Sequence, residues 1–237
     1  MRRWAFAAGM AIVAAALFLQ YGLTVQALSY TAFAGIAGAA LLTDIDALAI
    51  PNRLIVTGIV CWAATIGFVP APQDGFGVGS LFVPFFGQGL IAVLADSLLG
   101  AFAVAGLVVL AAVVTEQVTG RPALGGGDVK LLFVAGLFLG LPGNVLTLFL
   151  ACMLGLLIAP VWQHAEKRRL APPPPQPSRY AQQGSQAIPS PRHRQGKEGS
   201  PQTQGPRTFP FGPAIALAAM TALLAGPSLM AQFLGLA

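Results

Sequence analysis

The sequence ALGGGDVKLL, Ala123 to Leu132, places an acidic side chain, Asp128, at the start of an apolar segment. Charged residues make up only 9% of the 237 residues, whereas hydrophobic residues make up 56%. An ordinary soluble domain has roughly 25% charged residues. The composition therefore predicts a polytopic membrane protein, in which Asp128 lies at the boundary of a spanning segment.

The apolar segments predict an all-α membrane fold. A helix of about 20 apolar residues crosses the ~30 Å hydrocarbon core and satisfies its own backbone hydrogen bonds in lipid. The stretch 81–114 is too long for one upright helix, and we expect its first part, 81–87, to be interfacial or re-entrant. About seven transmembrane helices are then expected, at approximately 4–23, 27–42, 54–69, 89–114, 131–141, 146–162 and from 209 onward.

The basic residues predict the orientation of the chain. Arg2 and Arg3 precede the first apolar segment, so the positive-inside rule places the N-terminus in the cytoplasm. In the seven-helix arrangement all 13 Lys and Arg fall on this side. The net charge of +5 lies in loops and not on a folded soluble surface, so we expect the lipid bilayer as a partner and no nucleic acid.

Composition also predicts the domain organisation. Residues 1–163 form a transmembrane core, and residues 209–237 supply its final helix. Between them, residues 164–208 are rich in Pro, Gln, Ser and basic side chains, which predicts a disordered cytoplasmic loop. Cys61 and Cys152 lie in apolar segments without paired spacing, so they are interpreted as packing residues and not as a disulfide or a zinc site.

A second acidic cluster suggests a partner for Asp128. Asp44 and Asp46 lie in LLTDIDALAIPNRL, Leu41 to Leu54, where another apolar segment ends. Ionisable residues in membrane segments are costly, which makes them functional candidates. Two carboxylates in one site can hold a single proton, so that one activates a water molecule while the other polarises a carbonyl group. The pattern predicts an aspartic active site, without cofactor or metal.

The three glycines before Asp128 have a predicted role in this site. Gly125, Gly126 and Gly127 allow close backbone approach and positive φ values, so an extended substrate strand could lie beside the carboxylate. A structural alternative is that Asp128 caps the N-terminus of the helix that follows.

Three separated motifs resemble the prepilin peptidases, the type IV prepilin leader peptidase family of membrane aspartic proteases. GGGDVKLL resembles the GxGD motif of that family, and D-x5-I-P-N, beginning at Asp44, resembles its first catalytic segment. FPFGP, Phe209 to Pro213, resembles the start of its final helix. The resemblance implies that Asp44 and Asp128 are the catalytic pair, with Asp46 as the second choice for the first carboxylate. It also implies that the accompanying motif residues are Gly125, Gly126, Gly127, Pro51 and Asn52.

The resemblance also implies an activity and a location. Family members remove the basic leader peptide from type IV prepilins at the cytoplasmic face of the inner membrane, just before the pilin's hydrophobic helix. The expected partners are a prepilin and the pilus assembly machinery. Because the chain has no paired CxxC motifs, it resembles the short forms that serve Flp or tight-adherence pili, and N-methyltransferase activity is not expected.

Two alternatives remain open. Presenilin-like intramembrane proteases also use a GxGD motif, although I-P-N and F-P-F-G-P are not their signatures. A multi-span transporter or channel could instead place functional acidic residues on an ion path, usually with internal symmetry between its halves. No such repeat is visible in the sequence.

Overall fold

The computed structural model describes residues 2–47, 50–69, 82–87, 89–120, 125–170 and 211–233. Every regular element in these ranges is helical, which confirms the predicted all-α fold. The elements in chain order are α1 (Arg2–Tyr21), α2 (Val25–Ala47), α3 (Asn52–Thr65), the 3-10 turn η1 (Ile66–Phe68), α4 (Val83–Phe86), α5 (Leu90–Thr119), α6 (Gly126–Leu170) and α7 (Gly212–Phe233).

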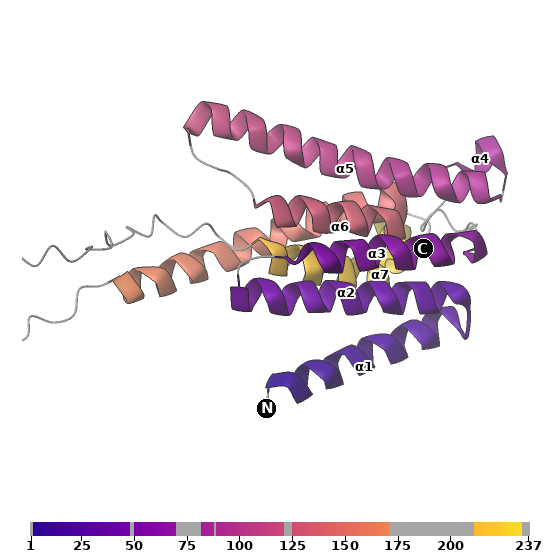
Figure 1. Ribbon diagram of the computed structural model, residues 1–237, viewed down its shortest axis with the longest axis horizontal. Helices are drawn as coiled ribbons and strands as arrows, with labels where there is room; N and C mark the ends of the chain where they lie inside the picture. Colours follow the sequence, from indigo (N-terminus) through magenta and orange to yellow (C-terminus); the bar gives the residue numbers. More distant parts are fainter. Residues whose placement is uncertain are drawn as a thin grey trace, which may run out of the picture. The chain divides into compact units, whose positions relative to one another are not determined.

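Helix α2 packs against α1, α3 and α7 (Figure 1). A small residue makes the contact with α1 possible, because a Cβ on Gly38 would lie 2.9 Å from Sδ of Met10. The same helix contributes Phe33, whose ring stacks on Phe138 of α6 at a centroid distance of 5.0 Å. Gly38 thus serves the packing of two helices, as small residues commonly do in membranes.

The backbones of α5 and α6 touch directly. A Cβ on Gly136 would lie 2.5 Å from both N and Cα of Ala101, and a Cβ on Gly100 would lie 2.6 Å from N of Leu141. Both glycines are buried. Only hydrogen atoms at these two positions allow the helices to approach this closely.

Helix α6 is a hairpin of two helical arms. Gly140 has φ 67° and ψ −173°, which interrupts the helix. Beyond this break, the Asn144 side chain donates hydrogen bonds to the carbonyl groups of Leu132 (3.1 Å) and of Gly100 in α5 (2.9 Å). A side chain cannot reach the carbonyl group of a residue twelve positions away along one straight helix. The chain therefore turns back, as predicted, with the turn beginning two residues before Pro142–Gly143.

A buried carboxylate stabilises this turn. Asp96 of α5 is 0% exposed and accepts a hydrogen bond of 3.1 Å from the backbone N–H of Leu141, at the start of the returning arm. The first N–H groups of a helix have no partner within the helix, so a side chain from a neighbouring helix can satisfy them. The hydrogen bond therefore joins α5 to α6.

The ambiguous stretch 81–114 contains one long helix. Helix α5 is continuous from Leu90 to Thr119, whereas α4 has only four residues and packs against α5. Two long elements, α3 and α5, thus lie between Asp44 and Asp128 in the sequence. An even number of long helices between two residues returns the chain to the same end of a helical bundle.

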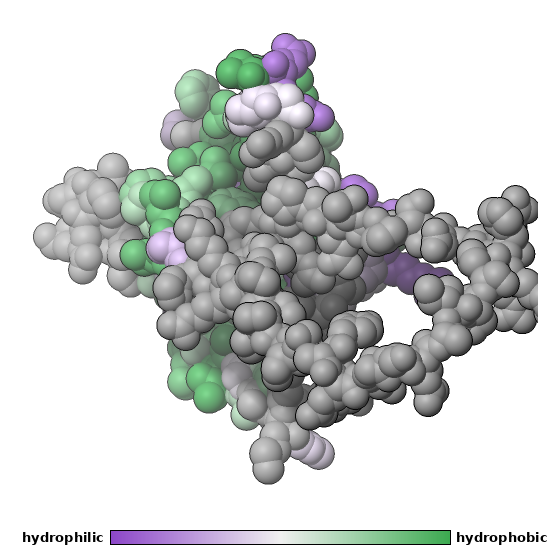
Figure 2. Space-filling model, turned by 90° about the vertical axis from the view of Figure 1, so that its left-hand side faces the viewer, coloured by the Kyte–Doolittle hydropathy of each residue, from purple (hydrophilic) through white to green (hydrophobic). Residues whose placement is uncertain are grey.

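The exposed surface of the described helices is strongly apolar. Hydrophobic residues, green in Figure 2, lie on the surface, and Phe102, Leu110 and Val118 of α5 are 63%, 61% and 81% exposed. Among the described residues, three segments are long and apolar enough to cross a membrane, and shorter apolar helices cover Phe6–Tyr21, Asn52–Phe68 and Gly212–Gly226. The chain is a helical membrane protein, while the count of seven crossings stays a prediction. The three long segments are Val25–Asp44, Leu90–Thr119 and Gly126–Pro160.

Several boundaries differ from the predicted ones. Helix α2 continues to Ala47 and α6 begins at Gly126, so Asp44 and Asp128 lie inside helices and not in loops. The described residues fall into two units, one that ends at Leu157 and includes α7, and one that consists of the last part of α6, Ile158 to Leu170. Helix α6 extends to Leu170, beyond the predicted start of the polar loop at His164. The rest of that loop lies outside the described residues.

Candidate active site

Two carboxylates meet at the first residue of α7. A Cβ on Gly212 would lie 2.6 Å from Oδ2 of Asp44 and 3.2 Å from Oδ1 of Asp128. Both oxygen atoms are therefore within 3.2 Å of the same position, that of a Cβ on Gly212, so the distance between the two oxygen atoms is at most twice 3.2 Å. Asp44 comes from the last turns of α2 and Asp128 from the first turn of α6.

Both carboxylates are largely removed from solvent. Asp44 and Asp128 are each 7% exposed. Oδ2 of Asp44 has no hydrogen-bond partner within the part of the chain that the structure describes. A buried polar atom without a partner carries a desolvation cost of about 1–3 kcal/mol, more for a charged group. Such an atom next to a second carboxylate is well placed to share a proton with it or to bind a water molecule or a substrate.

Asp128 occupies the third position of its helix. Its carboxylate accepts a hydrogen bond from the backbone N–H of Gly125, the residue before α6. This contact satisfies one of the free N–H groups at the helix start, as the acidic member of a capping box does. Asp128 therefore caps the start of α6 and also lies beside Asp44, so a capping role does not exclude a role in the carboxylate pair.

The glycines before Asp128 leave room for neighbouring atoms and do not adopt positive φ values. Positive φ values occur at Gly22, Gly87, Gly120 and Gly140, and at none of the three motif glycines. Of the two properties that the sequence suggested for these glycines, positive φ is not observed. Close approach is observed, because a Cβ on Gly127 would lie 3.3 Å from Cβ of Ile50, and one on Gly125 would lie 3.3 Å from Oδ2 of Asp128.

The I-P-N segment lies against the GGGD segment. Besides the contact of Ile50 with Gly127, Nζ of Lys130 donates a hydrogen bond of 2.8 Å to Oδ1 of Asn52. Pro51 adopts an extended conformation immediately before α3, so that Asn52 is the first residue of that helix. Lys130 thus joins the two motif segments.

The other candidate residues are placed as follows. Asp46 belongs to α2, but its side chain lies outside the described residues. Asp96 binds the turn of α6 at Leu141. Leu141 is thirteen residues after Asp128, which is roughly 20 Å along a helix, so Asp96 lies away from the carboxylate pair. Gly212 was not predicted as a site residue, although the FPFGP motif contains it.

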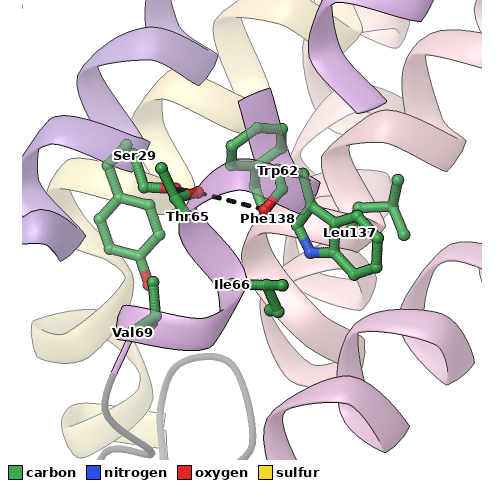
Figure 3. A pocket seen from close by; sticks show the side chains of 8 residues that line it. Ser29, Trp62, Thr65, Ile66, Val69, Leu137 and Phe138 are labelled. Atoms are coloured by element: carbon green, nitrogen blue, oxygen red, sulfur yellow. Dashed lines mark hydrogen bonds between the residues drawn. The ribbon is translucent and has the colours of Figure 1, made fainter. Parts of the chain in front are cut away.

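A separate pocket lies at the other end of α2 and α3 (Figure 3). The hydroxyl groups of Ser29 and Thr65 form a hydrogen bond of 3.0 Å there. Ser29 is fifteen positions from Asp44, which is roughly 22 Å along a helix, so the pocket is not part of the carboxylate site. Its lining residues are Ser29, Tyr30, Trp62, Thr65, Ile66, Val69, Leu137 and Phe138.

The fold and the site define a helical membrane protein with two carboxylates paired at one end of its helical bundle. A model of the type IV leader peptidase family matches residues 31–160, more than half of the chain, and this range includes both Asp44 and Asp128. The chain therefore belongs to the type IV leader peptidase family, and it is a protease. Searches of curated proteins and of solved structures find no match.

Proposed function

We propose that the chain is an aspartic endopeptidase that removes the basic leader from type IV prepilins of the Flp kind. The observation that carries this proposal is the convergence of the buried Asp44 and Asp128 on Gly212. The family supplies the reaction class, peptide cleavage, and the carboxylate pair supplies groups that can perform it.

The proposed mechanism follows from the placement of the pair. With one proton between them, the ionised carboxylate accepts a proton from a water molecule as that water attacks the scissile carbonyl carbon. The protonated carboxyl donates a hydrogen bond to the carbonyl oxygen and stabilises the negative charge that develops there. A proton then passes to the leaving nitrogen, and the peptide bond breaks.

The proposed setting is the cytoplasmic face of the inner membrane. The site lies where α2 ends and where α3, α6 and α7 begin. With the N-terminus in the cytoplasm and seven crossings, this end of the bundle is the cytoplasmic end. A prepilin with its leader in the cytoplasm and its hydrophobic helix in the bilayer would reach the carboxylates from there. Cleavage without methyl transfer stays a prediction, which an assay for a methylated product N-terminus checks.

Cleavage of a prepilin tests the proposal. We expect the purified protein, in detergent or lipid, to cut a candidate Flp-like prepilin between its basic leader and its apolar helix. Mass spectrometry of the product identifies the new N-terminus. A cut inside the apolar helix would indicate a presenilin-like protease. Ion flux in proteoliposomes that depends on Asp128, with no cleavage of any prepilin, would indicate a transporter.

The motif glycines should differ in their sensitivity to alanine. For Gly125→Ala and Gly127→Ala we expect a loss of cleavage rate of about tenfold, because each added methyl group displaces a neighbour by a few tenths of an ångström. Gly126→Ala should have the smallest effect of the three, since a Cβ there meets nothing within 4 Å. Initial rates on one prepilin provide the comparison. Equal losses at all three positions would contradict this ranking.

A further inference from the structure

The first residue of α7 has no room for a side chain. A Cβ on Gly212 would lie 2.6 Å from Oδ2 and 3.0 Å from Cγ of Asp44, which is closer than non-bonded carbon and oxygen atoms normally approach. It would also lie 3.2 Å from Oδ1 of Asp128. A methyl group at this position therefore has to displace a carboxylate or move the start of α7.

The start of α7 is packed against its neighbours. The ring of Phe211 packs against Gly155 of α6, where a Cβ would lie 2.7 Å from Cε2 of the ring. Ala214 and Ile215, whose N–H groups donate hydrogen bonds to the Phe211 carbonyl within the first turn of α7, are both buried, so a shift of this turn would disturb their packing. Displacement would therefore fall on the side chain of Asp44, which is not held through Oδ2 by any described residue.

We propose that Gly212 is a positioning residue of the active site, whose missing side chain lets α7 form a wall against both carboxylates and sets the distance between them. That distance matters because two carboxylates share one proton only when they are close, and both have to reach the same peptide bond. The expected effect on catalysis rests on the proposed aspartic peptidase function. The expected clash between a side chain at position 212 and Asp44 does not depend on that function.

Kinetics of the full chain in lipid test the catalytic consequence. For Gly212→Ala we expect kcat on a prepilin to fall by about 100-fold, as a misplaced catalytic group does, with KM within about twofold of wild type. The matched control is Gly106→Ala on α5, where a Cβ meets nothing within 4 Å and the residue is exposed. If Gly212→Ala and Gly106→Ala retain the same kcat, the proposal is wrong.

A stability cycle tests the geometry without any substrate. The melting temperature is measured for wild type, Gly212→Ala, Asp44→Ala and the double variant. Asp44→Ala removes the carboxylate that the new methyl group meets, so it should restore most of the stability that Gly212→Ala loses. Rescue of folding by Asp44→Ala also supports the proposal if Gly212→Ala alone does not fold. An equal loss of stability in both backgrounds would show a general packing role and overturn it. A wild type that cleaves no prepilin would count against the proposed function alone, because this cycle does not depend on activity.

Discussion

Replacing Asp128 or Asp44 with asparagine should lower the rate of prepilin cleavage by about 10³-fold, which is within the range attributed to a general acid or base. Asparagine has nearly the same size and shape as aspartate, but it can neither accept nor deliver the proton that the mechanism requires. Both side chains are 7% exposed and lie beside Gly212. Initial rates of the two variants, measured with folded protein at saturating substrate, provide the test.

The matched control for these variants is Glu116→Gln, which neutralises an exposed carboxylate on α5. We expect it to cleave at the wild-type rate. Asp46→Asn decides between the two upstream carboxylates. Loss of cleavage in Asp46→Asn together with normal cleavage in Asp44→Asn would move the catalytic role to Asp46, and normal cleavage in Asp128→Asn would remove the carboxylate pair from the mechanism.

Gly136→Ala should strongly destabilise the contact between α5 and α6. The added Cβ would lie 2.5 Å from N and Cα of Ala101, and these backbone atoms cannot move without shifting α5. Overpacking costs typically 1–3 kcal/mol, so we expect a loss of about 3 kcal/mol, at the upper end of that range. Thermal or denaturant unfolding of the protein in detergent measures the loss.

Gly106→Ala is again the control, because it adds the same methyl group to α5 at a position with nothing within 4 Å. It should unfold like the wild type. If the two variants have equal stability, direct contact between the backbones of α5 and α6 does not limit the packing of these helices.

The sequence was most informative where the signal is local. Hydropathy predicted the helices, because a spanning segment is apolar along its own length. The separate apolar segments 131–141 and 146–162 predicted the hairpin within α6. Boundaries were less accurate, since α2 continues through Asp44 and Asp46. Hydropathy treats a charged residue as the end of an apolar segment, whereas the helix continues as long as its backbone hydrogen bonds do.

The candidate site was only partly predictable. The GxGD and D-x5-I-P-N motifs identified Asp44 and Asp128, and the family match covers both. The sequence offered both close approach and positive φ as uses of the motif glycines, and the structure shows only the first, because a glycine motif alone does not distinguish the two. The pairing of Lys130 with Asn52 also has no local signal, since the two residues are 78 positions apart.

By itself, the sequence determined that this is an all-helical membrane protein and which carboxylates to consider, because composition and motifs are properties of short segments. Only the tertiary structure decided what surrounds those carboxylates. It places Gly212 of the last helix against both of them, and it holds Asp96 at the turn of α6 and away from the site. The physical reason is that these environments arise from close packing between helices far apart in the chain, where the absence of one methyl group fixes the approach of two segments.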